Sequence, residues 1–189
     1  MKKNIFILLA IANLLAVEAQ EKTDMNPFFK AYETKFEVPP FHLIKNEHFL
    51  PAIKEGIEQQ SNEIVAIANN SAKPTFENTI VALENSGELI HKVNQVFGNL
   101  NGANTNDELQ KIARETSPLL SASNDNIYLN DQLFDRVKNV WENRESFSLN
   151  QEQAKLLEKT YKRFVRSGAN LSASEKEKLR KLNSEISLL

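Results

Sequence analysis

The sequence predicts an all-α protein built from several amphipathic helices. Its five glycines and six prolines are about half of the usual share, which disfavours turn-rich β architectures. Apolar residues recur at helical spacing in successive stretches, and residues that can cap a helix stand before several of them. No stretch carries the alternating pattern of a strand. The 189 residues are enough to bury a core, so we expect a multi-helix lobe.

Residues 1–19 have the features of a cleaved signal peptide. Two lysines precede an apolar run from Ile5 to Val17, and small residues stand at Val17 and Ala19, before the expected cleavage site. The run is too short to cross a bilayer comfortably, because about 20 apolar residues are needed. We therefore expect an exported protein, periplasmic or secreted, with no membrane attachment after cleavage. A buried N-terminal helix is the alternative.

Residues 20–46 are expected to form an extended arm. Pro27, Pro39 and Pro40 hold the preceding residues away from helical backbone angles. The aromatic residues of this arm supply apolar surface, and we expect them to dock onto the rest of the molecule. They are Phe28, Phe29, Tyr32, Phe36 and Phe41.

Residues 47–189 are expected to form a helical lobe. Its first helix begins near Glu47 and closes at Asn69 and Asn70. The second is expected over 75–97, with Gly87 inside it, where a glycine would let a neighbouring helix approach closely. A break is expected over 98–104.

Four more helices follow in the predicted lobe. Capping residues mark their starts: Thr105 with Glu108, Asn130, Ser148 with Gln151, and Ser172 with Glu175. Pro118 should kink or restart the first of the four, and Gly168 should end the third. The apolar stripe of the last helix still continues at Leu188 and Leu189 without a stop signal, so we expect a truncation within that helix.

The composition disfavours several classes of function. Acidic and basic residues are interspersed, with a net charge of −2, so no basic face for nucleic acid is expected. Cysteine is absent, which removes disulfides, thiolate nucleophiles and cysteine-based metal sites. The sequence has neither a G-x-S-x-G motif nor a glycine-rich phosphate loop. One cationic group on the fifth predicted helix suits either solubility or a weak anionic contact: Lys155, Lys159, Lys162, Arg163 and Arg166.

The three histidines do not form a zinc-peptidase motif. Helical zinc hydrolases place two histidines four residues apart with a glutamate between them, and His42, His48 and His91 have no such spacing. A site of His42, His48 and Glu47 is one reading, and a surface or capping role is the other. His91 is expected to be solvated. The residues therefore predict no catalytic, cofactor-binding or metal-ligating side chain.

Several long segments resemble one peptidase family. The stretch from Pro74 to Ile90, PTFENTIVALENSGELI, resembles the N-terminal half of the M3 family of zinc oligopeptidases, the thimet-oligopeptidase group, and is most similar to its bacterial peptidyl-dipeptidases, or dipeptidyl carboxypeptidases. Supporting segments occur in the same order along the chain: NPFF at Asn26, PPF at Pro39, HFLPAIKEGI at His48, EIVAIANN at Glu63, ANTNDELQ at Ala103, DNIYLNDQLFDRV at Asp125 and FVRSGANLS at Phe164.

The resemblance implies two helical lobes flanking a deep channel. In this family the zinc is held at the channel floor by two histidines of an H-E-x-x-H helix and a further glutamate, and the zinc-bound water attacks the peptide carbonyl. Members of the subgroup remove dipeptides from the carboxyl end of short peptides. None of these catalytic residues carries over, because H-E-x-x-H occurs nowhere in this sequence. The segments present correspond to the lobe that forms part of a channel wall.

Two hypotheses of different classes follow. The first is the N-terminal portion of an exported, zinc-dependent peptidyl-dipeptidase that acts on short peptides and is monomeric when complete. Zinc belongs to the full-length family member, so this chain alone should bind none and be inactive. The second hypothesis is a stand-alone helical module that is derived from that lobe and has a peptide-binding or regulatory role.

Overall fold

The computed structural model describes residues 26–189 and is all-α over that range. The predicted fold class is therefore confirmed for these residues. Six helices of at least twelve residues account for most of the described chain: α2 (Phe49–Ala68), α4 (Glu88–Ala103), α5 (Asp107–Tyr128), α6 (Asp131–Glu142), α7 (Gln151–Arg166) and α8 (Ala173–Ile186). The predicted signal peptide, 1–19, lies outside the described residues, as does the start of the arm.

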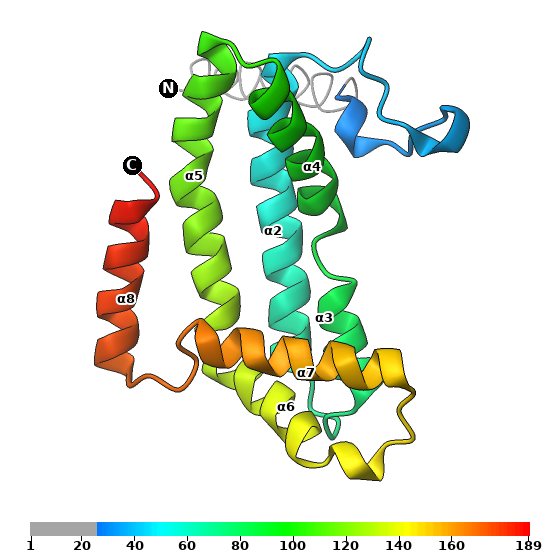
Figure 1. Cartoon of the computed structure of the whole chain (residues 1–189), viewed down its shortest axis with the longest axis vertical. Helices are drawn as coiled ribbons and strands as arrows, with labels where there is room; N and C mark the ends of the chain where they lie inside the picture. Colours follow the sequence, from blue (N-terminus) through cyan, green and yellow to red (C-terminus); the bar gives the residue numbers. More distant parts are fainter. Residues whose placement is uncertain (1–25) are drawn as a thin grey trace, which may run out of the picture.

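The three central helices stand side by side along the long axis of the molecule (Figure 1). Helix α2 packs against both α4 and α5, and α8 flanks α5 on its other side. Helices α6 and α7 cross the lower end of these helices, while the arm lies at the upper end beside α2 and α4. The lobe is thus a bundle with one transverse end.

The arm consists of extended backbone and short 3-10 turns, at Pro27–Phe29 and Lys35–Glu37. Phe28 is buried, and its ring centroid lies 5.3 Å from that of Phe49 in α2. Phe36 and Phe41 are exposed, by 84% and 50%. The expected docking of arm aromatics is therefore right for Phe28 and wrong for these two.

The second predicted helix is divided, and the role expected of Gly87 was wrong. A π-helical turn (Phe76–Val81) and α3 (Ala82–Glu84) come first, and α4 begins after Gly87, which has a left-handed φ of 76°. Left-handed backbone favours glycine, so this residue turns the chain instead of lying in a helix. The close helix approach occurs at Gly56 of α2, where a Cβ would lie 2.8 Å from the backbone nitrogen of Ile90.

Two other expected boundaries are corrected around α5. Helix α4 continues to Ala103, so the break expected over 98–104 is wrong, and Asn106 caps α5 in place of Thr105 by accepting from the Leu109 amide at 2.9 Å. Helix α5 also runs through Pro118 without interruption. A proline in a helix loses one amide bond to the carbonyl four residues earlier. That carbonyl belongs to an exposed residue, where water can replace the lost donor.

The helix ends near the carboxyl side follow the sequence signals more closely. Asn130 caps α6, Gly168 follows α7 with a φ of 97°, and Ser172 with Glu175 forms the predicted capping box of α8. The start of α7 is displaced, because Asn150 with Gln153 forms its capping box in place of Ser148 with Gln151. A capping box needs a hydrogen-bonding side chain at each end, and both pairs satisfy that pattern.

Two apolar clusters hold the lobe together. The upper cluster joins the arm, α2, α4 and α5, and its buried side chains include Phe28, Phe49, Ile53, Val93 and Phe97. The lower cluster joins the end of α2, the π-helical turn, α6 and α7, and includes Phe76, Ile80, Leu133, Phe134, Val137, Leu157 and Phe164. Burial of such side chains contributes about 1.5–3 kcal/mol each. The long α2 helix belongs to both clusters and links them.

Candidate functional site

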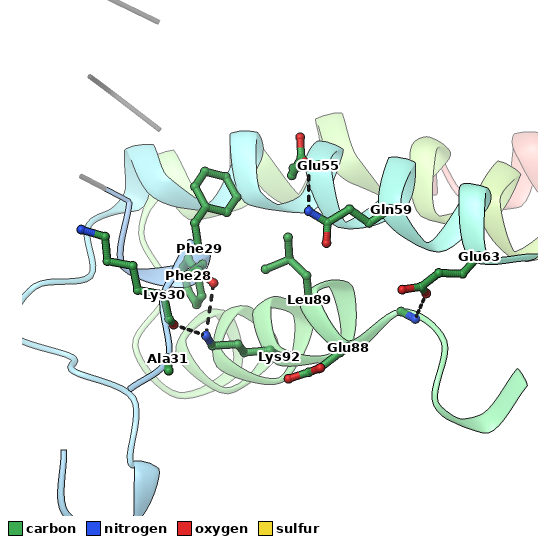
Figure 2. Close-up of a pocket in the computed structure, with 11 residues that line it drawn as sticks. Phe28, Phe29, Lys30, Ala31, Glu55, Gln59, Glu63, Glu88, Leu89 and Lys92 are labelled. Atoms are coloured by element: carbon green, nitrogen blue, oxygen red, sulfur yellow. Dashed lines mark hydrogen bonds between the residues drawn. The ribbon is translucent and has the colours of Figure 1, made fainter. Parts of the chain in front are cut away.

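The first candidate site is a cleft of about 580 Å³ between the arm, α2 and α4, called here the arm cleft. Lys92 of α4 fixes one wall of it. Its ammonium donates to the backbone oxygens of Phe28 (3.1 Å) and Lys30 (2.7 Å) and lies 3.9 Å from the ring centroid of Tyr32. Figure 2 shows this side chain reaching from α4 to the arm. Burial lowers the pKa of Lys92, and the carboxylate of Glu88 opposes that shift.

The rest of the arm cleft combines an apolar floor with a carboxylate rim. Phe29 and Leu89 supply the apolar surface, and Glu55, Glu63 and Glu88 supply the carboxylates. Two of the carboxylates are already engaged: Glu55 accepts from Gln59 at 2.8 Å, and Glu63 accepts from the Gly87 amide at 2.7 Å. This chemistry suits a long side chain with an aliphatic stem and a cationic end, such as that of lysine or arginine.

The second candidate site is a cleft of about 730 Å³ between α2, α4, α5 and α7, called here the α7 cleft. Arg163 of α7 lies over the ring of Tyr128, with its guanidinium carbon 4.4 Å from the ring centroid. Lys159 and His91 also line this cleft, and Glu84 brings one carboxylate. Burial raises the pKa of Tyr128, while Arg163 opposes that shift. The N–H donors of a guanidinium match the geometry of a planar anion such as a carboxylate.

The cationic group predicted on α7 is divided by one carboxylate. Glu158 pairs with Lys155 at 2.7 Å and also pairs with Lys162. These hydrogen bonds from Lys155 and Lys162 lower the pKa of Glu158 to about 2, although the Glu158 side chain is partly exposed to solvent. Two of the five cations are thereby paired, and Arg163 and Lys159 are the ones that line the α7 cleft.

The histidines considered as metal ligands have other surroundings. His48 accepts a hydrogen bond at Nδ1 from the Lys45 amide (3.0 Å), which is the capping role given as an alternative. Burial lowers the pKa of His48, with Glu47 opposing and Lys45 adding to the shift. His42 and His48 both line a cleft beside the arm, and Glu47 is not among the residues that line it. His91 is exposed, as expected.

Across residues 26–189, no three histidine or acidic side chains come together as a group able to hold a metal ion. The same range contains no helix with the length and apolarity needed to cross a membrane.

Sequence reasoning missed three cations, of which Lys92 is half-buried and Arg136 and Lys176 are buried. Lys92 holds the arm, as described above. Arg136 of α6 is 7% exposed and donates to the carbonyl oxygens of Asn70 and Ala72 and to the side chains of Asn78 and Thr79. The acceptors lie at least 57 residues away from it. No local pattern indicates such partners, because two are backbone oxygens after α2 and two are side chains of the π-helical turn.

Arg136 also explains part of the segment that resembles the peptidases. Thr75 and Asn78 form a reciprocal capping box at the start of the π-helical turn, and the Asn78 oxygen accepts from Arg136 at 3.0 Å. The motif from Pro74 onward thus forms the start of the π-helical turn, and Arg136 connects this start to α6 and to the segment that follows α2. Its role in the described residues is structural.

Comparisons with known proteins identify relatives over most of the chain. The dipeptidyl carboxypeptidase of Escherichia coli (strain K12) is 45% identical over 167 residues, which are 88% of this chain and 24% of that protein. The corresponding protein of Salmonella typhimurium (strain LT2) is 42% identical over 87% of this chain and 24% of its own length. Oligopeptidase A of Escherichia coli (strain K12) is 23% identical over 82% of this chain and 23% of that protein. No protein-family model matches the chain.

The chain therefore spans about a quarter of the length of the curated relatives that it matches.

Proposed function

We propose that this relative of the M3-family peptidyl-dipeptidases forms the N-terminal helical lobe of a zinc peptidase that releases dipeptides from the carboxyl end of short peptides. One observation carries the proposal: the chain is 45% identical to a dipeptidyl carboxypeptidase over 88% of its length, yet it covers only 24% of that protein. The features of a signal peptide in residues 1–19 support export of the same protein.

The residues of this chain do not fit the zinc site of that family. The H-E-x-x-H motif is absent from the sequence, and His42, His48 and His91 lack the spacing that brings two imidazoles to one ion. We derive no catalytic step from these residues. The metal ligands and the general base are expected in the part of the protein that corresponds to the unmatched three quarters of the relatives, so this chain alone should be inactive.

In the full-length protein, the lobe would form part of one wall of a peptide channel. The α7 cleft is the better candidate for peptide contact, because Arg163 and Lys159 suit carboxylates and Glu84 suits a cation. The arm cleft offers the complementary combination of apolar floor and carboxylates. Helices α2, α4 and α5 hold both clefts in place, since each cleft takes residues from at least two of the helices.

A chimera tests this proposal. The matched quarter of the Escherichia coli dipeptidyl carboxypeptidase would be replaced by residues 26–189, and dipeptide release from short peptides would be followed by mass spectrometry. We expect the chimera to release dipeptides and to lose that activity with a metal chelator. The 189-residue chain, assayed with added zinc, should release none.

Two results would overturn the proposal. Chelator-sensitive dipeptide release by the 189-residue chain would assign catalysis to these residues. A folded but inactive chimera, together with cooperative unfolding of the isolated chain and peptide binding without zinc, would instead favour the stand-alone peptide-binding module.

A further inference from the structure

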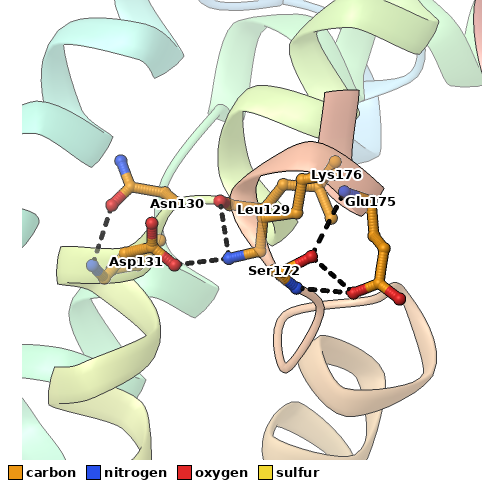
Figure 3. Close-up of polar contacts among 7 residues, drawn as sticks. Leu129, Asn130, Asp131, Ser172, Glu175 and Lys176 are labelled. Carbon is orange, nitrogen blue, oxygen red and sulfur yellow. Dashed lines mark hydrogen bonds and ion pairs between the residues drawn. The ribbon is translucent and has the colours of Figure 1, made fainter. Parts of the chain in front are cut away.

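Helix α8 is attached to the lobe through polar contacts. Lys176 is its one buried residue, at 6% exposed, and its ammonium pairs with Asp131 at the start of α6 and donates to the backbone oxygen of Leu129 at 3.4 Å. Figure 3 shows Lys176 reaching from α8 toward these two residues, with the Ser172–Glu175 capping box beside it. The first turn of α8 is therefore held by charge and hydrogen bonds.

The same kind of contact continues along α8 toward its carboxyl end. Arg180 donates to the Asn126 side chain at 2.9 Å, and Asn183 donates to the Asp125 side chain at 2.7 Å. The Ser121 hydroxyl donates to the backbone oxygen of Asn183 at 3.3 Å. Positions 176, 180 and 183 recur at helical spacing, so they form the face of α8 that lies on α5.

Leu179 of α8 is half-buried and lies beside Gly168, whereas the other two large apolar side chains of the helix are exposed. Leu182 is 54% exposed and Ile186 is 64% exposed. They are four residues apart, so they lie on one side of the helix, about a quarter to a third of a turn from the centre of the polar face. A surface helix normally turns its apolar stripe inward and its charged residues outward. Helix α8 departs from this arrangement at three positions, because Lys176 is buried while Leu182 and Ile186 are exposed. The outward pair Leu182 and Ile186 is called here the α8 apolar face.

We propose that the α8 apolar face is the surface on which a later segment of the same polypeptide packs in the full-length protein. This inference rests on the proposed function. The relatives are about four times as long as the segment matched here, so a large part of such a protein is available to cover this face. The covering segment would present apolar side chains, as in a helix of the catalytic half.

A second copy of the chain is a poorer occupant. A stable dimer buries about 800 Å² on each partner, and two aliphatic side chains on one 14-residue helix supply far less apolar surface. A segment of the same polypeptide loses less translational and rotational freedom on docking, so a small apolar contact is sufficient.

Thiol labelling of single-cysteine variants tests the proposal, because residues 1–189 contain no cysteine. Ile186→Cys places a thiol on the α8 apolar face, and Ser184→Cys is the matched control at an exposed position of the same helix. Each would be labelled in the 189-residue chain and in the full-length protein from the native gene, with the label located by peptide mapping. In the 189-residue chain the two thiols should react at similar rates. In the full-length protein the Ile186→Cys thiol should react at least about tenfold more slowly than the control.

Each other outcome overturns the inference in a different way. Equal rates for the two thiols in a full-length, zinc-dependent peptidase would contradict the docking surface and leave the proposed function intact. If the native gene encodes only the 189-residue product, both the docking surface and the proposed function are contradicted. If the Ile186→Cys thiol of the 189-residue chain is labelled more slowly as the protein concentration rises, the α8 apolar face is covered by a second copy of the chain.

Discussion

Helices α4 and α8 attach to the long helices of the lobe in opposite ways. Helix α4 packs on α2 through apolar side chains and a glycine contact: Val93 is fully buried, and Gly56 lets the backbone of Ile90 approach closely. Helix α8 is held at its first turn by Lys176, which pairs with Asp131 of α6, and along α5 by other polar residues. Its Leu182 and Ile186 side chains face outward. The difference teaches that α4 belongs to the lobe's own core, whereas the attachment of α8 in this chain depends on polar contacts, among which the Lys176 side chain is buried and its partner Asp131 is exposed.

The largest expected difference between the two helices is in the loss of unfolding free energy when one large apolar side chain of each is truncated to alanine. Phe97 of α4 is 8% exposed, and its ring centroid lies 5.1 Å from that of Phe49. Phe97→Ala should lower the free energy of unfolding by about 3–5 kcal/mol. Leu182→Ala on α8 should change it by less than about 0.5 kcal/mol, because this side chain is already half exposed. Urea unfolding followed by circular dichroism measures both, and equal losses would break the comparison.

A smaller effect is expected at the glycine contact. Gly56→Ala places a Cβ 2.8 Å from the Ile90 nitrogen, and this backbone atom cannot move aside without shifting α4. We expect a loss of about 1–3 kcal/mol in the free energy of unfolding. Gly98→Ala is the matched control, since nothing lies within 4 Å of its added Cβ, and it should gain up to about 1 kcal/mol from helix propensity. A stabilising Gly56→Ala would disprove the close approach.

The ion pair of α8 should give a smaller effect than the core changes. Asp131→Asn leaves the buried Lys176 ammonium without its carboxylate, at a cost of about 1–2 kcal/mol in the free energy of unfolding. Asp131 also stands in the first turn of α6, where a carboxylate is favourable by itself. Lys176→Met keeps the apolar stem, so a double-mutant cycle of the two changes isolates the pair. A coupling energy near zero would mean that Lys176 does not hold α8 through Asp131.

The smallest expected effect is a pH dependence on α7. The pKa of Glu158 is lowered to about 2 by Lys155 and Lys162, from an ordinary value of 4.5. A carboxyl with a lowered folded-state pKa stabilises the protein above pH 4.5 and loses that contribution as pH falls toward 2. Glu158→Gln should therefore flatten the acid side of the stability profile slightly, whereas Glu58→Gln, at an exposed position of α2, controls for the loss of a carboxylate. An unchanged profile would show that solvent screens these exposed pairs completely.

The sequence was sufficient for the parts of the fold that rest on local chemistry. Asn130 and the Ser172–Glu175 pair cap their helices as predicted, and Gly168 ends α7, because each signal acts within one turn. Gly87 was misplaced because a glycine inside a helix and a glycine at a left-handed turn interrupt the same periodic pattern. The role of Gly56 depends on α4, more than thirty residues along the chain, and no local pattern reports it.

The candidate clefts were less accessible to prediction than the helices. The cations on α7 were recognised, but the division of that group by Glu158 and the position of Arg163 on Tyr128 depend on side-chain geometry. Lys92 gave no signal, since its partners are backbone oxygens 62 and 64 residues away. Composition and spacing thus indicated which residues could bind charge, and tertiary packing decided which of them face a cleft.

The mass of the native protein in its own cell tests the central claim most directly, by immunoblot with an antibody to the lobe and by mass spectrometry. If the chain is the N-terminal lobe of a peptidyl-dipeptidase, the product should be about four times the length of the matched segment and contain an H-E-x-x-H motif beyond residue 189. A native product that ends at Leu189 would contradict the claim.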